Sequence, residues 1–116
     1  MGGPRIESYA FGHMTVDGEK HTNDLIVLPD RVVGNWWRDQ GHRLSPDDLD
    51  AVFDAGPDVL VVGTGAQGVM DVPPETRQAV TDAGMDLRVA RTGEAWRIYN
   101  DLQDEREAAG AFHLTC

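Results

Sequence analysis

The sequence predicts one α+β domain over residues 1–116, with three layers. We expect a mixed sheet that carries helices on one face, with an N-terminal β layer beside it. Three observations lead to this prediction. Short strand-like segments fill the N-terminal third, β-branched runs alternate with helical patterns afterwards, and no repeat or linker divides the chain. Chains of this size bury roughly two-thirds of their unfolded surface, which is sufficient for one core.

The N-terminal third is expected to form short antiparallel strands. Asp17-Gly18 separates two strand-like segments and is a typical two-residue hairpin turn. Pro29-Asp30 separates the next two apolar segments in the same way. The expected strands cover residues 6–11, 13–16, 19–21, 25–28 and 31–33.

A helix and a buried strand are expected next. Ser45 is a candidate N-cap because Pro46 suits the first helical position, and Gly56-Pro57 ends the helix. Residues 59–62 are Val-Leu-Val-Val, which is typical of a strand buried on both faces. This strand is the expected centre of the sheet.

The last third continues the alternation. A second helix is expected from Pro73 to Gly84, followed by a strand over residues 87–90. With the central strand they form a βαβ unit, which is right-handed in almost all proteins. Thr92 is expected to cap a third helix, and residues 111–114 are expected to form the last strand.

Composition excludes several classes of protein. One cysteine cannot form an internal disulfide framework, and no apolar run approaches the roughly 18 residues of a membrane span. The N-terminal residues contain no apolar signal-peptide core, so we expect a cytoplasmic protein. A formal net charge of −10 repels phosphate backbones and anionic lipids, so neither nucleic acid nor a membrane surface is an expected partner.

The acidity has two interpretations. The chain carries 14 aspartates and 6 glutamates against nine arginines and one lysine. Short hydrated carboxylates with few lysines suit a salt-adapted surface, because concentrated salt screens their mutual repulsion. A GC-rich genome that favours arginine and aspartate codons would produce the same bias, and composition does not separate the two.

The spacing Gly-x-Gly-x-x-Gly occurs at residues 63–68, directly after the central strand. In dinucleotide-binding folds such glycines let the backbone approach a pyrophosphate at a helix N-terminus. Here the next helix begins too late, so a structural glycine turn is the simpler interpretation. The alternative is a small-ligand or anion site at this turn. Its candidate residues are Gly63, Thr64, Gly65, Gln67, Gly68, Thr92, Tyr99 and Asn100.

No catalytic or metal-ligating constellation is complete in the sequence. Cys116 has no local activating group, because His113 would lie on the other face of an ideal strand. These two residues alone are too few for a zinc site, and the remaining histidines show no ligand spacing. We therefore expect no catalytic residues, no metal and no cofactor.

One aromatic and basic cluster provides a candidate partner surface. Trp36 and Trp37 precede Arg38, and His42 follows shortly after. One tryptophan is expected in the core, while the other is suited to line a pocket or a partner surface. The nearby basic groups could receive an anionic group, although packing with solvated arginines is the simpler interpretation.

With these residues laid out, the chain resembles the family called domain of unknown function 498. Members include archaeal and bacterial stand-alone proteins, mitochondrial respiratory complex I assembly factor 3 and an adipogenesis-associated vertebrate protein. The resemblance implies a three-layer β, β and α fold and no established reaction, while the eukaryotic members suggest assembly work. The residues that carry it are Asp24-Leu25-Ile26-Val27, Pro29, Trp37, Gly41-His42, Leu44, Val61-Val62-Gly63-Thr64-Gly65, Gly68, Glu75, Thr92, Ala95, Tyr99-Asn100 and His113-Leu114-Thr115-Cys116.

These observations favour a non-enzymatic cytoplasmic binding or assembly-factor-like domain, because a fold signature is present without a catalytic constellation. Its expected partner is an unidentified protein, and a second copy of the chain is one option. The alternative function is small-ligand or anion binding, or an enzymatic reaction, at the turn of residues 63–68. A concave polar pocket would favour this alternative, and an exposed tryptophan in an apolar patch would favour the partner.

Overall fold

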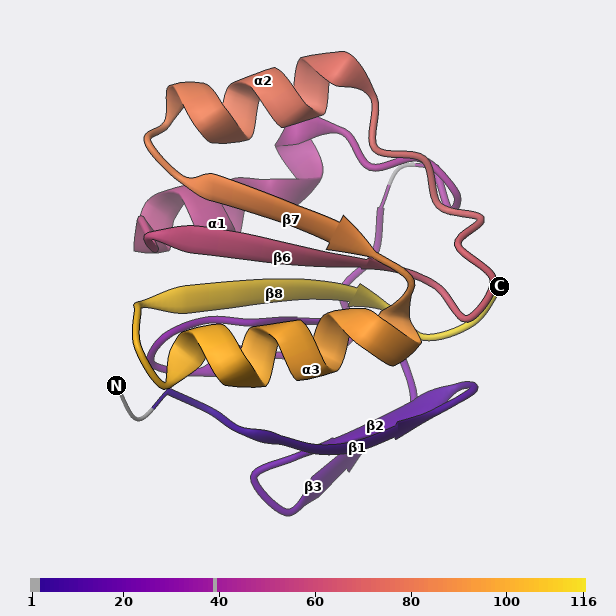
Figure 1. Ribbon diagram of the computed structural model, residues 1–116. Coiled ribbons are helices and arrows are strands. Elements are labelled where there is room, and N and C mark those ends of the chain that lie inside the picture. The colour runs from indigo at the N-terminus through magenta and orange to yellow at the C-terminus, as the bar shows by residue number, and fades with distance from the viewer. Residues whose placement is uncertain (1–2, 39) are drawn as a thin grey trace.

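Two β-sheets and three α-helices make up the computed structural model, which describes residues 3–38 and 40–116 (Figure 1). The smaller sheet has the order β1-β2-β3 and is antiparallel throughout. Asp17 and Gly18 both adopt positive φ, 49° and 83°, as a tight hairpin turn between β2 and β3 requires. The predicted hairpin is therefore present. The strands are β1 (Ile6–Ala10), β2 (His13–Val16) and β3 (Glu19–His21).

The larger sheet is mixed, as the sequence predicts, with the order β5-β4-β8-β6-β7. Strands β8, β6 and β7 are parallel, while β4 runs antiparallel to both β8 and β5. Every residue of β6 and of β8 is buried, which agrees with the continuous apolar run of the central strand. The strands are β4 (Leu25–Val27), β5 (Val32–Val33), β6 (Val59–Thr64), β7 (Asp86–Ala90) and β8 (Ala108–His113).

The helices pack against both faces of the larger sheet, whereas the sequence analysis expected them on one face. A short 3-10 turn η1 (Pro46–Leu49) leads into α1 (Asp50–Ala55), which shares its face with α2 (Pro74–Asp82). Helix α3 (Thr92–Gln103) lies on the opposite face (Figure 1). No helix among the described residues is long and apolar enough to cross a membrane.

The topology explains why α3 changes face. From β6 the chain goes through α2 to β7 on one side, and from β7 it returns through α3 to β8 on the other side of β6. Crossovers of one hand that run in opposite directions along a sheet place their helices on opposite faces. The strand order, which the sequence alone did not establish, therefore decides the position of α3.

Alternate residues of β6 and β8 belong to two apolar cores, one on each face of the larger sheet. Leu60 and Val62 face α1 and α2, where Val52 and Val80 cover them. Val61 and Phe112 face the other way, and there the core is closed by Tyr99 from α3 and by apolar side chains of the smaller sheet. The structure thus has three layers: α1 with α2, the larger sheet, and α3 with the smaller sheet. The smaller sheet is the N-terminal β layer that the sequence predicts.

Two side chains of α3 bind the N-terminal residues through three hydrogen bonds. The Tyr99 hydroxyl donates to the backbone carbonyl of Pro4 at 2.6 Å. The Asn100 side-chain amide accepts from the Ile6 N–H at 3.0 Å and donates to the Ile6 carbonyl at 2.7 Å. Because Tyr99 is buried, and because Asp17 adds a negative charge, the pKa of Tyr99 lies above its usual range. The hydroxyl therefore stays a donor.

Packing of β8 against its own Phe112 predicts the effect of a minimal substitution. A Cβ atom on Gly110 would overlap the ring of Phe112, which is fully buried. Gly110→Ala is therefore expected to lower the free energy of unfolding by about 1–3 kcal/mol in urea titrations. Gly93→Ala is the matched control, because Gly93 is exposed at the start of α3 and its Cβ would meet nothing within 4 Å. Equal stability of the two variants would contradict this account of the core.

Candidate functional site

The chain ends in a segment, residues 113–116, that several loops enclose. We call it the C-terminal segment; it begins at His113, the last residue of β8, at the carboxyl edge of the parallel strands (Figure 1). Gly12 donates its N–H to the Leu114 carbonyl at 2.9 Å, and the Tyr9 hydroxyl donates to the same oxygen at 3.0 Å. Ligand sites of open α/β sheets form at this edge.

The glycine turn after β6 closes over this segment. Ala66 donates its N–H to the Thr115 carbonyl at 3.2 Å, and Val69 donates to the Cys116 carbonyl at 3.2 Å. Gly65 has a φ of +105°, and a Cβ there would collide with the Thr115 carbonyl oxygen. Glycine is therefore required at residue 65 for two separate reasons, backbone conformation and close approach. These N–H donors are bound within the chain and are not directed at a ligand.

Thr92 connects the glycine turn to the C-terminal segment. Its hydroxyl donates to the His113 carbonyl at 2.6 Å and accepts from the Gly65 N–H at 2.9 Å. Thr92 is the first residue of α3, and the N-cap is Arg91, so the expected capping role of Thr92 is wrong. The hydroxyl forms a tertiary bridge instead of a local cap.

The remaining candidates for the turn site are placed as follows. Gly63 is buried, and a Cβ there would meet Thr92 and Phe112, so this glycine admits the start of α3. The Thr64 hydroxyl donates to the Ala90 carbonyl at 3.2 Å. Gln67 and Gly68 are exposed.

Two further candidates do not belong to the turn. Tyr99 and Asn100 bind Pro4 and Ile6, as described above, and the structure does not bring their polar groups to the turn.

A buried charged cluster lies beside the C-terminal segment. One carboxylate oxygen of Asp24, Oδ2, lies 2.8 Å from the Arg38 guanidinium and 2.7 Å from His113 Nδ1. The other oxygen accepts the Leu114 N–H at 2.8 Å. Arg38 also donates twice to the Gly41 carbonyl, at 2.7 and 3.1 Å. The Arg38 side chain is only 4% exposed, so it is not the solvated arginine that the sequence suggested.

The same contacts set the ionisation of Asp24. Burial by itself raises the pKa of the carboxyl, but hydrogen bonds from His113, the Leu114 N–H and Arg38 outweigh it and hold the pKa below its usual range. The carboxylate therefore stays charged. In turn, burial and the Asp24 charge raise the pKa of Tyr9, so its hydroxyl keeps its proton.

The sequence by itself does not predict this cluster. Asp24 and His113 are 89 positions apart, and no local pattern connects them. The one available signal was a lone acidic residue directly before the apolar run of β4, which begins at Leu25. An acid directly before a buried strand such as β4 has to find a partner.

A hollow of about 280 Å³ opens next to the charged cluster. Trp37 lines it and is 77% exposed, whereas Trp36 is 7% exposed and donates its indole N–H to the Asp48 carbonyl at 2.9 Å. The expected division between a core and a surface tryptophan is thus observed, and Trp36 belongs to the core. The full lining is Thr22, Asn23, Asp24, Trp36, Trp37, Arg38, Gly41, His113, Leu114 and Thr115.

Three loops that contact or flank the C-terminal segment each carry an exposed apolar side chain. Among the described residues, the exposed large hydrophobic side chains are Phe11, Trp37 and Val69. The residue after Phe11 binds the Leu114 carbonyl, Val69 binds the Cys116 carbonyl, and Trp37 shares the hollow with Leu114 and Thr115. Loops that are distant in sequence therefore meet at one short segment.

Three possible metal ligands also meet here. Ligand atoms of His42, His113 and Cys116 all lie within 4.8 Å of one another. A zinc site looked incomplete from the sequence because His113 and Cys116 alone are too few ligands and the other histidines show no ligand spacing. The structure adds His42 from a separate loop. It also brings His113 and Cys116 together, because β8 ends at His113 and Cys116 adopts a φ of 34°, far from extended backbone.

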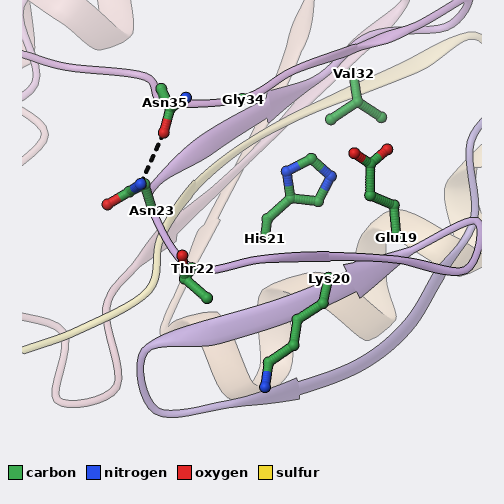
Figure 2. Close-up of a pocket in the computed structure, with 8 residues that line it drawn as sticks. All are labelled: Glu19, Lys20, His21, Thr22, Asn23, Val32, Gly34 and Asn35. Atoms are coloured by element: carbon green, nitrogen blue, oxygen red, sulfur yellow. Dashed lines mark hydrogen bonds between the residues drawn. The ribbon is translucent and has the colours of Figure 1, made fainter.

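A second hollow, of about 350 Å³, lies between β3 and β5, the edge strands of the two sheets (Figure 2). Figure 2 shows the His21 ring inside it, while Lys20 extends away. The Asn23 amide donates to the Asn35 side-chain oxygen at 2.7 Å at one end. Its lining is polar and contains no cluster of three metal-ligating groups.

Fold and site together define a single-domain α+β protein whose distinctive groups converge at the carboxyl edge of its parallel strands. The chain belongs to the protein family of unknown function DUF498/DUF598, whose model matches residues 6–113. This match confirms the resemblance inferred from the sequence.

Solved structures share the fold over almost the whole chain. The conserved hypothetical protein PH1505 from Pyrococcus horikoshii OT3 is 27% identical, with a TM-score of 0.81 over 97% of this chain and 99% of that chain. Rpa2829 from Rhodopseudomonas palustris is 33% identical, with a TM-score of 0.77 over 93% and 81%. A Mth938-like domain from Bordetella pertussis is 20% identical and shows the fold alone, with a TM-score of 0.70 over 96% and 85%. These names state no activity.

The Thr92 bridge gives a prediction for stability. Thr92→Val keeps the shape of the side chain but leaves the Gly65 N–H and the His113 carbonyl without their partner. We expect the free energy of unfolding to fall by about 1–3 kcal/mol. Thr81→Val, on an exposed turn of α2, is expected to change it by less than about 0.5 kcal/mol. A Thr92 variant as stable as the Thr81 variant would contradict the bridge.

The charged cluster gives a second prediction. Asp24→Asn removes the carboxylate that faces the buried Arg38 guanidinium, and an uncompensated buried charge costs about 3–5 kcal/mol of stability. The Arg43–Glu75 pair is the control, since both of its side chains are exposed. Glu75→Gln is expected to cost less than about 1 kcal/mol. Similar losses in the two urea titrations would show that the Asp24 pair is not buried in solution.

Proposed function

We propose that this chain is a non-catalytic protein-binding module whose docking surface surrounds the C-terminal segment. The observation that carries the proposal is that Phe11, Trp37 and Val69, which are 64%, 77% and 45% exposed, belong to three loops that meet at this segment. Large apolar side chains are normally scattered on a monomer, and a group of them marks an interaction site. An exposed tryptophan beside a hollow is a common anchor of a protein interface.

The chemistry of the neighbouring groups supports a docking surface over a ligand or catalytic site. The charge of Arg38 is neutralised by Asp24, so it is not available to bind an anion. The N–H groups of Ala66 and Val69 bind carbonyls of the C-terminal segment. Groups that would recognise a small anion are therefore used to hold the fold together.

The partner is a protein that presents an apolar side chain flanked by basic residues. The apolar side chain would enter the hollow beside Trp37. The formal net charge of −10 favours a basic partner, because opposite charges steer the two proteins together and raise the association rate. We assign this work to the cytoplasm, where the free Cys116 thiol remains reduced. The assembly-factor part of the proposal rests on the family resemblance alone.

Photocrosslinking at single positions tests this surface in the native cells of the protein. A photoreactive phenylalanine analogue replaces Phe11, Trp37 or Val69 in three separate variants, with Asp82 as the control. Asp82 is exposed and is the last residue of α2, and this helix ends far from the C-terminus of the chain (Figure 1). All three surface positions are expected to crosslink to the same partner protein, at a peptide of the partner that is rich in basic residues. The control position is not expected to crosslink to it.

Two further measurements complete the test. Trp37→Ala is expected to weaken binding of that partner on the order of 30-fold, and Asp82→Ala is expected to leave it unchanged. The association rate is expected to fall as salt is added. Adducts no stronger than those of the control position would overturn the proposal. Adducts only to a second copy of the chain would replace it with self-association.

A further inference from the structure

His42, His113 and Cys116 bring two imidazoles and one thiol together from three separate parts of the chain. His42 lies in the loop before η1, His113 ends β8, and Cys116 ends the C-terminal segment. Their ligand atoms all lie within 4.8 Å of one another. Within residues 3–38 and 40–116, this is the one group of three metal-ligating side chains at such distances.

Asp24 orients the ring of His113. Asp24 Oδ2 lies 2.7 Å from Nδ1, and because a carboxylate oxygen accepts, the ring is assigned the tautomer that donates from Nδ1. The Arg38 guanidinium lies farther from the same nitrogen, at 3.2 Å. In the neutral ring the lone pair is then on Nε2. A carboxylate behind a histidine, holding its ring and its tautomer in this way, is the usual support of a metal-ligating histidine.

His113 Nε2 itself points to a missing ligand. His113 is 5% exposed, and Nε2 is buried without any hydrogen-bond partner. A buried polar atom of this kind normally has a partner, because leaving it unsatisfied costs about 1–3 kcal/mol. Neither the backbone nor a side chain among the described residues supplies that partner.

We propose that His42, His113 and Cys116 bind a divalent transition-metal ion of the zinc class, with a fourth coordination position left open. Imidazole nitrogen and thiolate sulfur are the ligands that zinc and cobalt accept, whereas calcium and magnesium require oxygen ligands. Three protein ligands and an open position are typical of zinc sites that bind a further group. The Cys116 thiol loses its proton on coordination.

The site needs only a small contraction to reach coordination distances. Metal–ligand bonds of about 2.0–2.3 Å in a tetrahedral arrangement place the ligand atoms roughly 3.5 Å apart. His42 is exposed and Cys116 is half-buried, so both side chains can move toward the fixed His113 ring. The exposure of His42 also provides the entry path for the ion.

This inference does not depend on the proposed docking function. The site involves none of Phe11, Trp37 and Val69, and it is tested with the purified chain alone. Loss of metal binding would leave the photocrosslinking result untouched, and the reverse is also true.

Cobalt(II) titration tests the site directly, because a cobalt–thiolate bond produces a charge-transfer band and tetrahedral coordination produces intense visible bands. Metal-free protein, prepared with a chelator and kept reduced, is titrated with cobalt(II) and then with zinc(II). We expect both bands to saturate at one ion per chain, and zinc to displace the cobalt. Absence of the thiolate band would overturn the proposal.

Matched variants assign the ligands. His42→Ala removes an exposed ligand with little effect on folding, and Cys116→Ser removes the sulfur. Each is expected to weaken zinc binding at least roughly 100-fold in competition with a chromophoric chelator, as the loss of a direct ligand should. His21→Ala, at a histidine outside the cluster, is the control and is expected to bind as the parent chain does. Equal affinity in the His42 and His21 variants would show adventitious binding and overturn the proposal.

Discussion

The Asp24 carboxylate is the interaction on which the carboxyl edge of this protein depends. Its two oxygens hold the Arg38 guanidinium, the His113 ring and the Leu114 N–H within 2.8 Å. Arg38 comes from a loop, and His113 and Leu114 belong to the C-terminal segment. A buried anion of this kind is tolerated only when it is fully paired, so the parts that pair it must assemble together. Pairing this charge therefore fixes the positions of the Arg38 loop and the C-terminal segment relative to Asp24.

Small residues make the remaining contacts at this edge possible. Gly63 admits the first residue of α3, and Gly65 admits the Thr115 carbonyl, each at a distance that a Cβ would prevent. The Thr92 hydroxyl then joins the glycine turn to the His113 carbonyl. The glycine-rich turn resembles a phosphate-binding loop in sequence, but in this protein it binds the C-terminal segment. Its backbone donors bind carbonyls of the chain in place of the oxygen atoms of a ligand.

The two proposals share a location for a physical reason. The carboxyl edge of the parallel strands is where the loops after β6 and β8 meet, and loops present side chains there without disturbing the sheets. The same convergence exposes apolar tips on the outside and aligns His42, His113 and Cys116 nearby. Docking and metal binding would therefore use adjacent groups, but they do not require each other.

Local chemistry in the sequence determined the element types, the Asp17-Gly18 hairpin and the buried strand of residues 59–62, because turns and apolar periodicity act between near neighbours. The family followed from a resemblance of motifs along the chain, and the family model matches residues 6–113. Only the tertiary structure decided the face of α3, since that depends on strand order. Only the tertiary structure also brings Asp24 into contact with His113, and His42 close to Cys116. Contacts between residues so far apart leave no periodic signal in one sequence, because they arise only when the layers pack.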